Sequence, residues 1–275
     1  MLTGLKEILD MAENGGFAVP AFNVYNMETV MGVIKAAEEA KSPVIIQSYS
    51  RLFTNEEGYF VSPIVLAAAK KASVPVCFYL DHGAGITEVT RALRYGASGI
   101  MIDKSALGID ENIAETKKIV DMCSAVDVAV EGELGHVGSV NDSKMQEFTK
   151  VDEAVRFVDE TGVAALAILV GTAHGRYKKA PKLAIDRIGE IHKSAKAHLV
   201  LHGGSGVPDD QIRAAVKAGI RKINFGTDVC YSFLDKVFET SRDLVAIDLF
   251  MKDAIESVKA FALTKIELLG AKGRV

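Results

Sequence analysis

The chain has 275 residues, of which 49% are apolar and 25% charged, and it carries a net charge of -4 with a pI of about 5.9. This composition allows one large core, and because α/β barrels routinely occupy about 250 residues, we expect a single domain over residues 1–275. The acidic balance lacks the basic footprint of a nucleic-acid-binding protein, and no apolar stretch reaches the roughly 20 residues that span a bilayer.

The N-terminal segment, residues 1–16, predicts an amphipathic helix that ends at a glycine pair. It lacks the basic start and the small-residue cleavage site of a signal peptide. The three cysteines, Cys77, Cys123 and Cys230, lie far apart in apolar segments without a CxxC pair. We therefore expect free core thiols in a cytoplasmic protein.

Eight short apolar runs follow, and each precedes a segment with apolar residues three and four apart, which predicts a helix. The expected strands are residues 17–24, 43–49, 74–81, 99–105, 127–134, 166–171, 198–203 and 222–227. Continuous apolar strands that alternate with helices imply a parallel sheet covered on both faces. Eight units without a GxGxxG turn favour a closed (β/α)8 TIM barrel over an open sheet, and residues 249–270 add a C-terminal helix.

Polar side chains stand at the carboxyl ends of these strands, where TIM barrels form their active sites. Asp81 and His82 end the third strand, His174 follows the sixth, and His202 ends the seventh. Neutral imidazoles suit zinc, and a catalytic zinc usually keeps three protein ligands. The same ends also carry Asn23, Asp103, Ser105, Glu131, Glu133, Asn224, Thr227 and Asp228.

The other three histidines are less well placed to belong to the active site. His192 lies in a predicted helix and is expected in solvent, while His198 begins a strand at the opposite, stability-determining end. His136 follows the carboxyl end of the fifth strand, where active sites form, so it could contact the substrate.

Glycine-rich turns form a second group of candidates, "GTAHG" (171–175), "HGGSG" (202–206) and "NFGTD" (224–228). Phosphate sites in TIM barrels commonly use the loops after the last strands, where glycine lets backbone N–H groups approach an anion. The candidate phosphate-binding residues are Gly175, Gly203, Gly204, Ser205, Gly226 and Thr227. The basic stretch "GRYKKAPK" (175–182) reads equally well as a solvated loop or an anion contact.

A metal beside a carboxylate and a phosphate-binding loop suits the cleavage of a carbon–carbon bond in a ketose phosphate. Asp81 could then move the hydroxyl proton. Adjacent residues on an extended strand point to opposite faces, so Asp81 and His82 share a site only if the strand turns there.

These motifs resemble those of the class II, metal-dependent ketose-bisphosphate aldolases of the fructose- and tagatose-bisphosphate types. The resemblance runs nearly end to end and includes "LDHG", "VEGELGHVG", "GTAHG", "LHGGSG" and "KINFGTD". It implies that His82, His174 and His202 hold zinc and that Asp81 is the acid/base. It also implies a second metal position at Asp103 and Glu133.

The resemblance implies further properties. Residues matching Gly175, Gly203, Ser205, Asn224 and Thr227 bind the dihydroxyacetone phosphate portion, beside which a sodium or potassium ion often sits. The small-molecule substrate is a sugar phosphate such as fructose 1,6-bisphosphate, and the assembly is a homodimer or homotetramer.

Two departures from the family pattern concern the substrate. Asn141 stands where a glutamate is often found, which leaves Asp142 or His136 as the second acid/base. Tyr49 stands about where small residues commonly face a phosphate, so Tyr49 or Arg51 is expected to recognise a different group. A non-phosphorylated or longer aldehyde partner is therefore the alternative substrate.

Three other functions remain as alternatives. A Schiff-base aldolase needs a desolvated lysine inside the barrel. Lys222 is expected to start the last strand at the wrong end, and Lys104 to point outward or pair with Asp103. A non-catalytic sugar-phosphate-binding subunit of a partner aldolase would keep the barrel without the chemistry. A metal-dependent hydrolase is disfavoured because the HxH and HExxH ligand pairs are absent.

Overall fold

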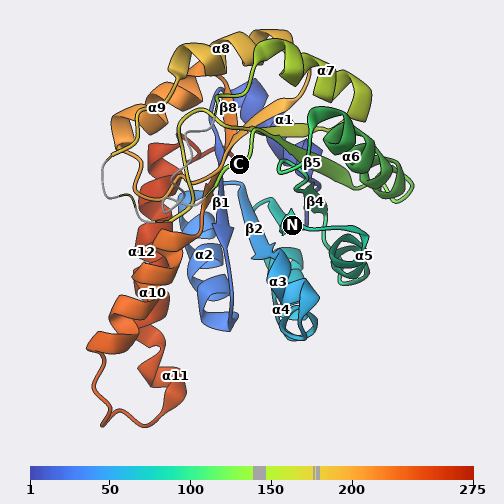
Figure 1. Cartoon of the computed structure of the whole chain (residues 1–275). Coiled ribbons are helices and arrows are strands. Elements are labelled where there is room, and N and C mark those ends of the chain that lie inside the picture. The colour runs from blue at the N-terminus through green and yellow to red at the C-terminus, as the bar shows by residue number, and fades with distance from the viewer. Residues whose placement is uncertain (139–146, 176, 178–179) are drawn as a thin grey trace.

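Eight parallel strands form a closed barrel in the computed structural model, which describes residues 1–138, 147–175, 177 and 180–275 (Figure 1). Each strand pairs with its sequence neighbour, and β1 pairs with β8 to close the ring. The strands are β1 (Val19–Asn23), β2 (Val44–Tyr49), β3 (Val76–Gly83), β4 (Gly99–Ile102), β5 (Ala129–Leu134), β6 (Ala165–Ile168), β7 (His198–Leu201) and β8 (Ile220–Phe225). The predicted TIM barrel is confirmed.

Helices surround the barrel on its outer side (Figure 1). They are α1 (Leu5–Gly15), α2 (Met27–Ala40), α3 (Ser50–Thr54), α4 (Glu57–Lys71), α5 (Ile86–Arg94), α6 (Ile109–Ser124), α7 (Val151–Thr161), α8 (Ile185–Ser194), α9 (Asp209–Ala218), α10 (Thr227–Glu239), α11 (Ile247–Phe250) and α12 (Lys252–Leu268). None of those in the described ranges is long and apolar enough to cross a membrane.

The C-terminal part differs from the prediction of one helix over residues 249–270. A short α11 precedes α12, and both follow α10, which projects with α11 away from the barrel (Figure 1). The long α12 packs along α2, where a Cβ on Gly32 would lie 2.7 Å from Val258 Cβ. Glycine at this position therefore allows the two helices to approach closely.

The barrel interior changes in character along its axis. Strand residues such as Ile45 and Cys77, which pair in register, are wholly buried and form the apolar core, as the continuous apolar runs predicted. Toward the carboxyl ends, Gln47, Glu131 and Lys222 are also wholly buried. Burying such groups is costly unless they are paired, so their partners define the floor of the site.

The prediction that Lys222 begins the last strand at the remote end is wrong. The strand starts at Ile220, two residues earlier, and Lys222 therefore lies inside the barrel. By contrast, β4 ends at Ile102 and β6 at Ile168, so Asp103 and His174 belong to the loops that follow.

Candidate active site

The end of β3 turns sharply and directs two adjacent side chains into one cavity. His82 has a φ of 51°, in the left-handed region that residues other than glycine rarely adopt. The pairing of β3 with β4 also shifts register between Leu80 and Gly83. This turn brings His82 to the same side as Asp81, although neighbours on a regular strand point to opposite faces.

Three imidazoles converge at this mouth of the barrel. The His82 ring centroid lies 5.0 Å from that of His174 and 4.8 Å from that of His202. One nitrogen from each ring can be chosen so that all three atoms lie within 4.8 Å of one another. The backbone N–H of His174 donates to the Gly138 carbonyl at 2.8 Å and ties the loops after β5 and β6 together.

A buried network of charged and polar side chains inside the barrel fixes the orientation of the His202 ring. Its Nε2 lies 2.8 Å from Glu131 Oε1, and Glu131 Oε2 accepts from Tyr79 Oη at 2.7 Å and Lys222 Nζ at 2.9 Å. All four side chains are wholly buried. Because the Glu131 carboxylate occupies Nε2, the other ring nitrogen, Nδ1, is the one that could ligate a metal, an arrangement common for metal-binding histidines.

Two buried atoms in this part of the site lack hydrogen-bond partners among the described residues. They are His202 Nδ1 and Glu133 Oε2, which lie 3.1 Å apart. A buried polar atom without a partner is unusual and calls for an explanation. A cation that both atoms ligate would satisfy them, so the residues present fit a metal ion. A second group that could hold one comprises His82, Asp103 and Glu133.

The electrostatic environment differs among the three imidazoles. Burial lowers the pKa of His174 to about 4, and His82 and His202 reinforce the effect. Burial also opposes charge on His202, but Glu131 and Glu133 outweigh it and raise its pKa to about 10. The pKa of His82 is raised because Asp81 and Asp103 outweigh burial. The surrounding carboxylates therefore favour positive charge at this mouth.

Asp81 is held at the centre of the site by amide donors. Asn23 Nδ2 donates to Asp81 Oδ2 at 2.8 Å, and Asn224 Nδ2 lies 3.3 Å from Asp81 Oδ1. Gln47 Nε2 donates in turn to Asn23 Oδ1 at 2.8 Å. Asp81 is 3% exposed and its Oδ1 lies 3.9 Å from His82 Nε2, which places a fixed carboxyl group beside the imidazoles.

A further polar chain extends from His82 toward solvent. His82 Nδ1 lies 3.0 Å from Asp103 Oδ2, and the Ser105 hydroxyl donates to Asp103 Oδ1 at 2.7 Å. The Ser105 oxygen also lies 3.0 Å from Glu133 Oε1 and from His136 Nδ1. His82 and Ser105 outweigh the effect of burial and hold the Asp103 pKa well below its usual range. His136 is exposed at the outer end of this chain.

A cavity of about 720 Å³, a size typical of small-molecule sites, is lined by Asp81, His82, Asp103, His136 and His174. His202 is wholly buried and does not line it. From the predicted phosphate-binding set, the cavity lining includes Gly175, Gly203, Ser205, Gly226 and Thr227, together with Asn23 and Asn224. Gly204 does not line the cavity, because its N–H donates to the Asn224 carbonyl at 3.1 Å. Asp142 lies outside the described residues.

Glycine is required where the loops after β6 and β7 meet. Gly203 has a φ of 66°, and a Cβ there would lie 2.4 Å from the Ala173 carbonyl oxygen. Tyr177 Oη reinforces the contact, because it lies 2.8 Å from the Ala173 carbonyl oxygen and 3.0 Å from that of Gly203. The N-terminus of α10 opens onto the same side, since Gly226 precedes its first residue, Thr227.

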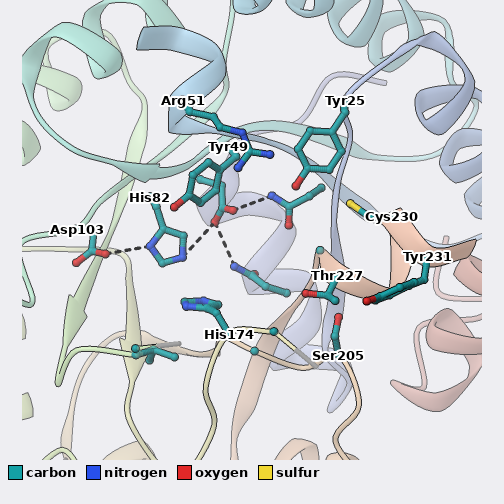
Figure 2. Close-up of a pocket in the computed structure, with 18 of the residues that line it drawn as sticks. Tyr25, Tyr49, Arg51, His82, Asp103, His174, Ser205, Thr227, Cys230 and Tyr231 are labelled. Carbon is teal, nitrogen blue, oxygen red and sulfur yellow. Dashed lines mark hydrogen bonds and ion pairs between the residues drawn. The ribbon is translucent and has the colours of Figure 1, made fainter. Parts of the chain in front are cut away.

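The cavity wall across from the glycine loops contains residues that the sequence patterns only partly predicted. Tyr49 and Arg51 line the cavity with Tyr25, which the strand-end criterion missed because it lies two residues beyond β1 (Figure 2). Cys77 and Cys123 are buried as expected, but the prediction of a core position for Cys230 is wrong. Cys230 is half-buried and also lines the cavity, since it sits on the inner face of α10.

The other candidates lie elsewhere. His192 is half-buried against Gly219 rather than fully solvated, because α8 packs against α9, whose C-terminal cap is Gly219. His198 lies at the amino end of β7, as predicted. Lys104 Nζ donates to the Ala84 carbonyl at 2.6 Å, and Lys222 pairs with Glu131 beneath the site. Neither lysine lines the cavity, so the described residues give no support to Schiff-base chemistry.

This combination of barrel and site defines a class of enzymes. Residues 3–274 match the family of class II fructose-bisphosphate aldolases, and the chain belongs to this family. The chain is accordingly an aldolase, a carbon–carbon lyase. The resemblance inferred from the motifs is confirmed, and a non-catalytic or hydrolytic function is not supported.

Several relatives show how far the similarity extends. YdjI of Escherichia coli K12 is 37% identical over 280 residues, which cover 100% of this chain and 99% of the relative. A sulfofructosephosphate aldolase of Alkalicoccus urumqiensis is 37% identical over 243 residues, 86% of this chain and 85% of the relative. The crystal structure of the YdjI aldolase superimposes with a TM-score of 0.91 at 35% identity over 100% of this chain and 99% of that one.

Proposed function

We propose that the protein is a zinc-dependent aldolase that reversibly cleaves a ketose phosphate into dihydroxyacetone phosphate and an aldehyde. The observation that carries this proposal is the convergence of three imidazoles on buried Asp81, beside glycine loops that suit a phosphate. Membership of the class II aldolase family supports the reaction class.

His82, His174 and His202 would hold the zinc ion, with Asp103 and Glu133 as a second position reached through the shared His82. When bound, the ion supplies a Lewis acid that polarises the substrate carbonyl and stabilises the charge that develops as the bond breaks. Glu131 and Lys222 orient the His202 ring for this task.

Asp81 is the proposed proton carrier of the cleavage step. Its carboxylate would accept the proton of the hydroxyl group that becomes the aldehyde oxygen, and would return it in the condensation direction. The amides of Asn23 and Asn224 fix the carboxylate without neutralising it. His136 or Asp142 would serve as the second acid/base; His136 is connected to the site through Ser105.

The phosphate of the dihydroxyacetone portion would lie against Gly175, Gly203 and Ser205, facing the N-terminus of α10 at Thr227. Backbone N–H groups and the helix dipole favour an anion at this position. A sodium or potassium ion beside the phosphate is part of the proposal.

Two classes of ketose, which differ in their aldehyde portion, are candidate substrates. Fructose 1,6-bisphosphate is the first candidate, and a ketose with a different or longer aldehyde portion is the second. The second is favoured by Tyr49 and Arg51 on the cavity wall and by the relative named sulfofructosephosphate aldolase.

The test is retro-aldol release of dihydroxyacetone phosphate, coupled to a dehydrogenase that reduces it. Fructose 1,6-bisphosphate, tagatose 1,6-bisphosphate and fructose 1-phosphate would be compared with and without a chelator and added zinc. Activity that the chelator removes and zinc restores supports the proposal. A chelator-resistant activity, or no activity on any ketose phosphate with zinc bound, contradicts it.

We also propose a cytoplasmic homodimer or homotetramer. The segment from the end of α10 to α11 exposes large apolar side chains, with Phe238 82%, Val245 83% and Ile247 72% exposed. An apolar surface of this kind on a projecting arm suits burial against a second copy of the chain (Figure 1). Light scattering on the eluting protein tests this, with Phe238→Glu and Val245→Glu expected to shift the mass toward that of a monomer.

A further inference from the structure

One tyrosine hydroxyl group joins the two loops that carry His174 and His202. Tyr177 Oη accepts from the Ala173 N–H at 2.8 Å, and it lies 2.8 Å from the Ala173 carbonyl oxygen and 3.0 Å from the Gly203 carbonyl oxygen. Ala173 directly precedes His174, and Gly203 directly follows His202. The hydroxyl group therefore fixes the backbone beside two of the three proposed zinc ligands.

The two loops have few other means of holding one another. No backbone hydrogen bond among the described residues joins 171–175 to 202–206. The loops approach closely at Gly203, where a Cβ would lie 2.4 Å from the Ala173 carbonyl oxygen. Burial raises the pKa of Tyr177, so its hydroxyl group stays protonated and can donate to one of the two carbonyl oxygens. Tyr177 Oη is thus the polar link between the loops.

The His174 ring depends on its backbone more than the other two imidazoles do. A carboxylate oxygen lies 3.0 Å from one ring nitrogen of His82 and 2.8 Å from one ring nitrogen of His202, so each of these rings has its own orienting group. In the described part of the chain, no hydrogen bond holds the His174 ring. Its placement follows from the loop, which is held by the bond to the Gly138 carbonyl and by Tyr177.

The same two loops also form the proposed phosphate surface. Gly175 and Ser205 line the cavity, whereas Tyr177 does not. The Tyr177 ring packs against the end of the second loop, since a Cβ on Gly206 would lie 3.3 Å from Tyr177 Cδ2. The Asp228 N–H donates to Ser205 Oγ at 3.2 Å and connects this loop to the first turn of α10. A shift of the loops would therefore move the phosphate surface together with the zinc ligands.

We propose that Tyr177 is a positioning residue whose hydroxyl group couples zinc binding to phosphate binding. It holds Ala173 against Gly203, so that His174 and His202 can ligate one ion while the phosphate surface keeps its shape. This inference rests on the proposed aldolase function. Because coupling between two sites is reciprocal, a phosphate on the loops should tighten zinc binding, and zinc should tighten phosphate binding by the same factor.

The experiment measures the Kd of zinc on the full chain, after removal of metal, by competition with a chromophoric chelator. Each titration is run in potassium phosphate and in potassium chloride of equal ionic strength and pH, and a protein-free titration corrects for zinc that phosphate itself binds. We expect phosphate to lower the zinc Kd of the unmodified protein at least about fivefold. Tyr177→Phe, which removes only the hydroxyl group, should raise the Kd in chloride about tenfold and reduce the effect of phosphate to less than about twofold.

Tyr59→Phe, the same substitution at an exposed position of α4, is the matched control and should keep both values. Urea denaturation of the metal-free proteins is measured alongside. A Tyr177→Phe protein that is less resistant to urea but keeps the full effect of phosphate on zinc binding would overturn the inference, because the role of the hydroxyl group would then be structural only. A phosphate-independent Kd in the unmodified protein would overturn it without any variant. Both results leave the proposed function standing, whereas an unmodified protein that binds no zinc would overturn the proposed function as well.

Discussion

Two clusters of histidines and carboxylates lie at opposite ends of the barrel, and only one of them has the properties of an active site. At the amino end, His198 Nε2 lies 2.9 Å from Asp10 Oδ1, and Arg221 Nε donates to Glu13 Oε2 at 2.8 Å. At the carboxyl end, His82, His174 and His202 converge with four acidic residues, Asp81, Asp103, Glu131 and Glu133. Residue types alone therefore do not distinguish a structural cluster from a catalytic one.

The difference lies in burial and in the pairing of charges. The side chains of Asp10 and Glu13 are 42% and 36% exposed, and their partners include the cations Lys6 and Arg221. At the carboxyl end, Glu133 and His202 are wholly buried, and Glu133 Oε2 and His202 Nδ1 face each other at 3.1 Å without a further partner in the described structure. An unsatisfied buried group is ready for a ligand, whereas a paired surface group is already satisfied.

The largest expected effect comes from removing an imidazole from the carboxyl-end cluster. His202→Ala should reduce bound zinc, measured by mass spectrometry of the metal, to below about 0.1 equivalents and lower kcat/KM at least about 10⁴-fold, because the Lewis acid is lost. His198→Ala at the amino end is the matched control and should keep zinc and activity within about twofold. A His202→Ala protein that retains both would remove the distinction between the clusters.

Asp81→Asn should separate proton transfer from metal binding. The amide is nearly the same size but cannot accept the hydroxyl proton, so kcat should fall about 10³-fold while bound zinc is unchanged. Steady-state kinetics and metal analysis of the same preparation provide the measurement. If kcat falls less than about tenfold, another group carries the proton and the assignment of Asp81 is wrong.

The buried network beneath His202 predicts an effect on stability. Lys222→Met leaves the wholly buried Glu131 carboxylate without its ammonium partner. The free energy of unfolding of the metal-free protein should fall by about 3–5 kcal/mol, measured by urea denaturation. Lys6→Met removes an exposed partner of Asp10 and should cost less than about 1 kcal/mol. Similar losses in the two variants would contradict the contrast between the ends.

Sequence patterns predicted the barrel well because most strands are apolar runs and most helices have an apolar face. They also placed the three histidines at one mouth, since all lie at or just beyond the carboxyl ends of predicted strands. They failed for Lys222, because an error of two residues at the start of β8 moved a buried lysine to the end of the barrel. The start of β8 is hard to locate because Arg221 and Lys222 interrupt the apolar pattern directly after Ile220.

Other features depended on three-dimensional paths that periodicity does not encode. The left-handed φ of His82 brings it beside Asp81, and such a conformation is not evident for a histidine in an extended run. Tyr25 and Cys230 reach the cavity from beyond β1 and from α10. Loop and helix-face contacts of this kind follow from packing rather than from the ends of strands.

The smallest predicted effect concerns the pH dependence of the amino-end cluster. Burial acts to raise the pKa of Asp10, but hydrogen bonds from Lys6 and His198 outweigh it, so the pKa is lowered. An acid with a lowered folded-state pKa contributes stability above its unfolded pKa of about 4 and loses it as the pH falls further. Asp10→Asn should therefore destabilise the protein by less than about 1 kcal/mol at pH 7, and this difference should narrow below pH 4. Urea denaturation at several pH values checks the trend, and a difference that grows on acidification would contradict it. Zinc content should not change, since the effect arises at the end of the barrel remote from His202.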